Sequence, residues 1–116
     1  MTGPRVFRVA DHLRLADGEP VRSVVHETAD ASAVAWIVKP GQRIVAHVHP
    51  HGADTWTIVA GQGAYQTEAS GASVPIAAGD IVIASSGEVH GVLNNGIEAL
   101  VFVAVVSPAL AGFEPL

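Results

Sequence analysis

Hydrophobic and polar residues alternate along most of this chain, in short runs that contain many β-branched and aromatic residues. Alternation with a period of two is typical of β-strands buried on one face, and these residue types favour strands. No segment shows the pattern of a three-turn amphipathic helix. The alternation predicts strands at residues 6–9, 21–26, 32–38, 44–49, 56–60, 64–67, 81–84, 91–93 and 100–106.

Glycine, proline, asparagine and aspartate separate the predicted strands, as at residues 60–63, 78–80 and 94–96. Glycine and asparagine adopt positive φ angles easily, so these segments predict turns. Many short strands divided by turns indicate a sandwich or barrel. With 116 residues and no evident linker, the chain is predicted to form a single all-β domain, residues 1–116.

The composition narrows the possible partners. The net charge is −5 and there is one lysine with no basic cluster, which argues against nucleic acid. No apolar run approaches the roughly 18 residues of a membrane span, and the first residues lack the apolar core of a signal peptide. We therefore expect no membrane association and a cytoplasmic location. The absence of cysteine excludes disulfides, thiolate metal ligands and a thiol nucleophile.

Three of the six histidines lie in one stretch, as His47, His49 and His51, and Asp54 follows closely. Side chains two residues apart on a strand point to the same face, so His47 and His49 can bind one ion together. Pro50 lacks the N–H that a strand interior needs, and a turn is expected there. Asp54 follows the turn, just before the next predicted strand. The segment predicts a metal site that spans a hairpin.

The spacing of these residues resembles the two sequence motifs of the cupin superfamily. The first match joins two glycines, two histidines and an acid: Gly41, His47, His49, Asp54 and Gly61. The second match is formed by Gly79, Ser85, Gly87, His90 and Asn94. The cupin motifs usually have glutamate in place of Asp54 and proline in place of Ser85. Two such motifs are far more specific than a single His-x-His pair. The resemblance covers about residues 36–106 and implies a double-stranded β-helix, the cupin jelly-roll barrel, with the ligand site inside it.

The resemblance also implies one divalent metal ion per chain, with His47, His49 and His90 as ligands and Fe, Mn, Ni or Zn as its identity. Asp54 is one methylene shorter than the usual glutamate. It either reaches the ion through a backbone shift, holds it through water, or orients a ligating imidazole from outside the coordination sphere. His51 is the alternative fourth ligand, an acid or base at the barrel mouth, or a plain turn residue.

Three imidazoles and one carboxylate leave open positions on an octahedral ion for a substrate or dioxygen. One expected function is a metalloenzyme of the dioxygenase, isomerase or lyase type, with His51 and Asp54 as candidate catalytic residues. The other is a noncatalytic binding or sensing module that uses the ion to hold an anionic ligand. Few polar residues lie on the predicted inward-facing strands, which favours a small, mainly apolar molecule as the partner.

We also expect a homodimer. A jelly roll of this size exposes sheet edges, and a chain that is 49% hydrophobic and 15% charged has few means of protecting them. The N-terminal strands are the natural exchange element. Residues 107–116 contain two prolines and are predicted to be too irregular for a strand, and to serve in packing or as a dimer clasp. Trp56 is predicted either to line the cavity or to belong to the core.

Overall fold

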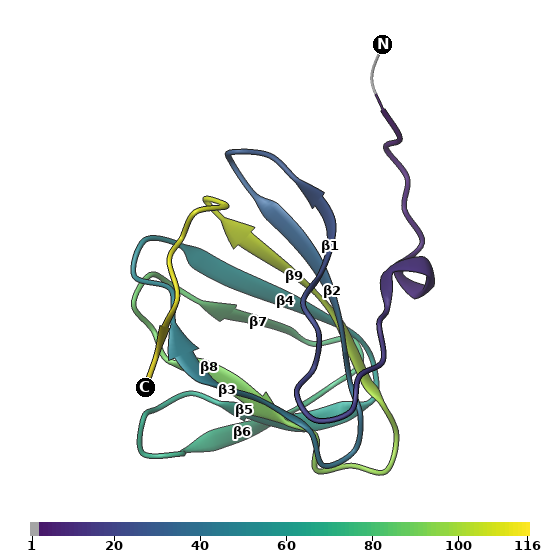
Figure 1. Ribbon diagram of the computed structural model, residues 1–116. Helices are drawn as coiled ribbons and strands as arrows, with labels where there is room; N and C mark the ends of the chain where they lie inside the picture. Colours follow the sequence, from purple (N-terminus) through teal and green to yellow (C-terminus); the bar gives the residue numbers. More distant parts are fainter. Residues whose placement is uncertain (1–2) are drawn as a thin grey trace.

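The computed structural model describes residues 3–116, and two five-stranded antiparallel sheets face each other in it (Figure 1). The first sheet contains, in spatial order, β1 (Ser23–Glu27), β2 (Ser32–Val38), β9 (Leu100–Ser107), β4 (Ala53–Ala60) and β7 (Ile81–Ala84). The second contains β10 (Glu114–Pro115), β3 (Arg43–Val48), β8 (His90–Leu93), β5 (Gln62–Gln66) and β6 (Ser73–Ala77). One short 3-10 helix, η1 (Val9–His12), precedes β1. This arrangement confirms the predicted all-β fold.

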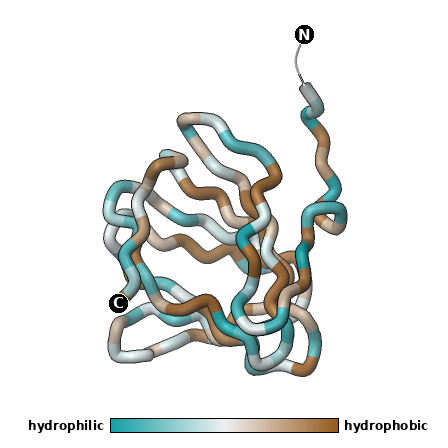
Figure 2. Tube along the Cα trace, viewed as in Figure 1, coloured by the Kyte–Doolittle hydropathy of each residue, from teal (hydrophilic) through white to brown (hydrophobic). Residues whose placement is uncertain are grey.

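The core lies between the two sheets and is built from the inward-facing residues of alternating positions. Its largest members come from β4 and β9, where the indole of Trp56 stacks on the ring of Phe102 with 4.2 Å between the centroids. Figure 2 shows hydrophobic residues along the strands and more hydrophilic ones at the connecting turns. Among residues 3–116, no helix is both long enough and apolar enough to cross a membrane.

The N-terminal segment differs from its prediction. Residues 6–9 are predicted as a strand, but residues 6–8 have no regular structure and Val9 begins the 3-10 helix. The segment extends away from the sheets in Figure 1, and the side chain of Val6 is 74% exposed. Alternating residues form a strand only where a neighbouring strand can pair with them, and the described chain offers none here.

Two strands lie where no strand is predicted. β6 contains Pro75, which interrupts the sequence pattern, but β6 is at the edge of its sheet, where a residue without an N–H is tolerated. The prediction that residues 107–116 are too irregular for a strand is wrong for Glu114 and Pro115, which pair with Val48 and His47 of β3. This pairing joins distant parts of the chain, so no local pattern predicts it.

A β-bulge in β3 changes the direction of its side chains. The pairing of β3 with β8 shifts register between Ile44 and His47. Residues three apart on a regular strand face opposite sides, whereas the bulge allows both of these side chains to line the same cavity. Gly91 on β8 lies against the bulge. A Cβ atom at Gly91 would lie 2.8 Å from the carbonyl oxygen of Ile44 and 3.0 Å from Cα of Ala46, so the bulge needs glycine opposite it.

Candidate metal centre

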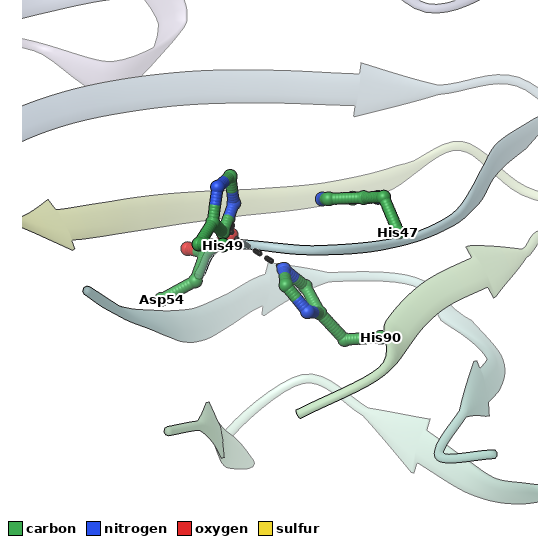
Figure 3. Close-up of side chains that lie close together, drawn as sticks. All are labelled: His47, His49, Asp54 and His90. Carbon is green, nitrogen blue, oxygen red and sulfur yellow. Dashed lines mark hydrogen bonds and ion pairs between the residues drawn. The ribbon is translucent and has the colours of Figure 1, made fainter. Parts of the chain in front are cut away.

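Four side chains meet between the two sheets: His47, His49, Asp54 and His90 (Figure 3). One potential ligand atom from each lies within 4.8 Å of every other. His47, Asp54 and His90 are buried, and His49 is partly buried. These are the four residues predicted from the sequence as metal ligands, and the structure brings all of them together.

The strands determine where each of these side chains points. His47 on β3 and His90 on β8 are directly paired, and the centroids of their rings are 4.2 Å apart. His49 follows the end of β3, and its ring centroid lies 5.0 Å from those of both His47 and His90. Asp54 is the second residue of β4 and comes from the other sheet. The cluster therefore joins the two sheets.

Backbone carbonyls fix the tautomer of all three imidazoles. Nδ1 of His47 lies 2.7 Å from the carbonyl oxygen of Val45. Nδ1 of His49 lies 2.6 Å from that of Gly112, and Nδ1 of His90 lies 3.1 Å from the oxygen of Glu88 two residues before it. A carbonyl oxygen only accepts hydrogen bonds, so each Nδ1 carries a hydrogen and donates it. This leaves Nε2 as the metal-binding atom of each ring.

The carboxylate of Asp54 lies against two of these Nε2 atoms. Its Oδ2 atom is 3.0 Å from Nε2 of His90 and 3.2 Å from Nε2 of His49. Its other oxygen, Oδ1, is buried without a hydrogen-bond partner among residues 3–116, as is Nε1 of the neighbouring Trp56. A buried carboxylate oxygen without a partner is costly, so Oδ1 is available to an ion or a water molecule.

Burial and hydrogen bonding set the charges of the cluster. Burial lowers the pKa of His47 to about 4. The hydrogen bond to Asp54 raises the pKa of His49. Burial would raise the pKa of Asp54, but the hydrogen bonds that His49 and His90 donate when their Nε2 atoms are protonated outweigh it and lower that pKa to about 2. A metal ion that binds these nitrogens displaces those protons. Asp54 is therefore an anion and His47 a neutral imidazole at neutral pH, which are the forms that bind metal ions.

The last nine residues, 108–116, form a C-terminal strap that runs from the end of β9 to β3 (Figure 1). The strap supplies the carbonyl of Gly112 that orients His49. The ring of Phe113 lies 4.8 Å from that of His47, measured between centroids. The strap therefore covers and positions the cluster, which is closer to the predicted packing role than to a free tail.

His51, the predicted alternative ligand and candidate acid or base, lies outside the cluster. Its side chain is exposed, and it does not line the cavity beside the cluster. Its backbone N–H donates to the carbonyl of Ala111 in the strap at 2.8 Å. The next residue, Gly52, is pressed against the strap, where a Cβ atom would lie 2.6 Å from that of Ala111. The turn is thus tied to the strap, with the His51 ring on the outside.

A cavity of about 420 Å³ opens beside the cluster, a size typical of small-molecule sites. His47, His49 and Asp54 form part of its wall, while His90 does not reach it. The remaining wall is apolar except for Arg22. Six of its apolar residues come from the strands, namely Val34, Trp36, Ile44, Trp56, Ala104 and Val106, and five come from the strap, namely Ala109, Leu110, Ala111, Gly112 and Phe113. Trp56 thus combines both of its predicted roles, core residue and cavity wall.

Sequence reasoning missed two parts of this site. Arg22 stands just before a strand and belongs to no motif, so no local signal marks it. The strap lacks the alternation of a strand, and only its pairing with β3 shows its position.

The donor set fits a divalent ion. A nitrogen or oxygen ligand lies about 2.1 Å from such an ion, which places neighbouring ligands of an octahedral ion about 3 Å apart. The separations between Oδ2 of Asp54 and the Nε2 atoms of His90 and His49, 3.0 and 3.2 Å, match this spacing. Imidazoles with one carboxylate suit Zn, Fe, Ni or Mn.

Known proteins resemble this chain along most of its length. Residues 34–106 match the cupin domain family. An oxalate-binding protein of Thermotoga maritima is 36% identical over 67 residues, which are 58% of this chain and 54% of that protein. The chain thus spans about half the length of that relative.

Solved structures show the same fold. An uncharacterized conserved protein with a double-stranded β-helix domain from Klebsiella pneumoniae is 48% identical, with a TM-score of 0.94 and 97% of each chain covered. A predicted oxalate decarboxylase from Thermotoga maritima is 24% identical, with a TM-score of 0.72 over 90% of this chain and 99% of that chain. At 24% identity, the likeness to the predicted oxalate decarboxylase shows only that the two proteins share a fold. The two sheets, the double-stranded β-helix of the relatives and the match over residues 34–106 agree, and this chain belongs to the cupin family.

Proposed function

We propose that this chain is a cytoplasmic cupin that binds one divalent metal ion through His47, His49, Asp54 and His90 and acts on a small organic molecule. The observation that carries the proposal is the convergence of three Nε2 atoms and one buried carboxylate beside an apolar cavity. Four ligands leave two positions open on an octahedral ion. Three of the four side chains reach the cavity wall, which supports open positions that face the cavity.

A bound divalent ion supplies Lewis acidity toward a carbonyl, enol or carboxylate oxygen and, if it is iron, the capacity to activate dioxygen. The apolar walls exclude water and bind the body of the substrate. Outside the cluster, no described residue of the cavity wall is an aspartate, glutamate, histidine, lysine or tyrosine. Asp54 is therefore the candidate for proton transfer within the cavity, and its Oδ1 has no hydrogen-bond partner among residues 3–116.

Noncatalytic binding is the second candidate function. The relative named an oxalate-binding protein supports it, and so does the lack of a separate acid or base in the cavity. An ion held by one carboxylate retains positive charge, so in this function it would hold an anionic ligand. Both functions use the same ion and the same cavity.

Metal content tests the proposed centre. Protein purified without a histidine tag should bind one Zn²⁺ per chain in elemental analysis, and the double variant His47→Ala/His90→Ala should bind none while remaining folded. His51→Ala is the matched control, because it removes an exposed imidazole of the same segment and should leave the stoichiometry unchanged. Unchanged metal content in the double variant would mean that the ion lies elsewhere.

An activity screen separates the two functions. Protein loaded with Fe²⁺, Mn²⁺, Ni²⁺ or Zn²⁺ is mixed with diketones, catechols and flavonols, and oxygen uptake and product formation are measured. Turnover that is lost in the His47→Ala/His90→Ala variant supports the enzyme. Tight, metal-dependent binding without turnover of any of these compounds supports the binding module.

We further propose that the chain forms a homodimer through the outer face of the first sheet. The outward residues of β7, Ile81 and Ile83, are 63% and 61% exposed, and Val59 of β4 and Val105 of β9 are exposed as well. Thr55 and Thr57 of β4 lie between β7 and β9 on this face. No charged residue lies on this outer face of β4, β7 and β9. An uncharged surface with several exposed aliphatic side chains favours association between subunits.

A further inference from the structure

Arg22 is the only charged side chain of the cavity wall outside the metal cluster, among the residues that the structure describes. It immediately precedes β1 and lines the cavity with Val34 and Trp36 of β2. Arg22 lines the same cavity as His47, His49 and Asp54 of the cluster. Positive charge from Arg22 and ligand atoms from the cluster therefore face one space.

A buried serine orients the guanidinium. Nη2 of Arg22 donates to Oγ of Ser32 at 3.1 Å, and Ser32 donates in turn to Glu27 at 2.6 Å. Ser32 is fully buried, so its hydroxyl is a fixed anchor. Among residues 3–116 the other N–H groups of Arg22, on Nε and Nη1, make no hydrogen bond, and a guanidinium has five such donors.

Glu27 forms only a weak ion pair with this group. Its Oε2 atom is 3.6 Å from Nη2 of Arg22, beyond hydrogen-bond distance, and the two side chains are 49% and 51% exposed. Ion pairs exposed to this degree are weak, so the charge of Arg22 remains available to a ligand.

We propose that Arg22 binds the carboxylate of the ligand, and that the ligand is an apolar molecule with a pair of metal-chelating oxygens at one end and this carboxylate at the other. The inference rests on the metal centre proposed above. The ion would bind the chelating oxygens of the ligand, and the apolar walls would contact its body. The guanidinium of Arg22 would bind the carboxylate through charge-assisted, bidentate hydrogen bonds.

The apolar walls distinguish this ligand class from the smallest dicarboxylates. Oxalate consists of two carboxylates without an apolar body, so it leaves walls such as Trp36, Trp56 and Phe113 without a contact. Burial of apolar ligand surface against these side chains stabilises a complex at about 25 cal/mol per Å². A catechol or enol that carries a carboxylate uses the ion, the walls and Arg22 together.

Two catechols of the same shape test this assignment. Protocatechuate carries a carboxylate on its ring, and dihydroxyacetophenone carries a neutral acetyl group of the same size in that position. Both are titrated by calorimetry, without oxygen, into protein loaded with one Zn²⁺ per chain, for the wild type, Arg22→Gln and Arg43→Gln. Arg43 is an exposed arginine of β3 that does not line this cavity, so it is the matched control.

We expect wild-type protein to bind protocatechuate at least tenfold more tightly than the ketone, which corresponds to about 1.4 kcal/mol. Arg22→Gln should remove this preference and leave the ketone affinity within about twofold, while Arg43→Gln should change neither. Equal wild-type affinities for the two catechols would overturn the assignment, and this comparison needs no variant. A preference that survives in Arg22→Gln would also overturn it. Failure to load Zn²⁺ is a separate result, since it would refute the metal centre itself.

Discussion

Asp54 is the residue on which the chemistry of the cluster depends most. Its Oδ2 atom lies 3.0 and 3.2 Å from two imidazole nitrogens, whereas Oδ1 has no hydrogen-bond partner among the described residues. These separations fit direct ligation of an ion, and they fit hydrogen bonds that orient His49 and His90 equally well.

Substitutions at Asp54 test direct ligation. Asp54→Asn should weaken Zn²⁺ binding at least tenfold, because it removes the charge that offsets the cation, whereas Asp54→Glu should retain or raise the affinity. Competition with a chromophoric chelator measures both dissociation constants. Full occupancy in Asp54→Asn would assign Asp54 the role of orienting His49 and His90 instead. If His51→Ala lost the ion at the same time, the fourth ligand would be a histidine.

The ligand residues could be predicted from the sequence because their spacing carries the information. His47 and His49 are two residues apart, and the glycine-anchored motifs add Asp54 and His90. Arg22 could not be predicted in this way, since its role depends on Ser32 and on a cavity wall formed by other strands. Position relative to a cavity is a property of the folded chain, not of a local pattern.

At the scale of elements, the bulge in β3 and the strap fix the imidazoles. The bulge turns His47 toward the cavity, and Gly91 provides the space that the bulged backbone needs. The strap fixes His49 through the carbonyl of Gly112. Most strand positions were predictable, because alternation marks a half-buried strand wherever a partner exists. The bulge, the edge strand β6 and β10 were not, because each depends on a neighbour distant in the sequence.

The variant Gly91→Ala tests whether the bulge in β3 positions the histidines of the cluster. The added Cβ atom would meet backbone atoms of Ile44 and Ala46 at 2.8 to 3.0 Å, and backbone cannot rotate away as a side chain can. We expect a loss of about 1–3 kcal/mol in the free energy of unfolding, measured in urea, and weaker Zn²⁺ binding, because Gly91 adjoins His90 and faces the segment that carries His47. Gly3→Ala is the control, since nothing lies within 4 Å of its Cβ position. A Gly91→Ala variant with wild-type stability and metal affinity would show that the bulge is not under this constraint.

At the scale of the whole molecule, the core covers the inner face of the first sheet, while the outer face of β4, β7 and β9 is uncharged and exposes Ile81, Ile83 and Val105. Of the N-terminal strands predicted as the exchange element, residues 6–9 do not form a strand, whereas β1 forms an edge of the first sheet. The outer face of β4, β7 and β9 is the candidate for the contact between subunits.

Sedimentation velocity at micromolar concentration tests this interface. The wild-type chain should sediment as a dimer, and Ile81→Lys/Ile83→Lys should give a monomer with unchanged metal content, because both side chains point away from the cavity. Ile97→Lys, at a side chain that is 94% exposed and outside this face, is the control and should remain dimeric. A monomeric wild-type chain, or a double variant that is still a dimer, would contradict the proposed interface.

The position of the two tryptophans has a practical consequence. The chain contains two, Trp36 and Trp56, and both line the cavity, with the indole of Trp56 centred 6.0 Å from the ring of His90. Their ultraviolet emission therefore originates entirely beside the proposed centre. Ions with a partly filled d shell quench indole emission at such short range, whereas Zn²⁺ does not. The unlabelled protein thus carries its own optical reporter, whose intensity would follow the exchange of one ion for another and whose colour would shift as a ligand displaces water from the cavity.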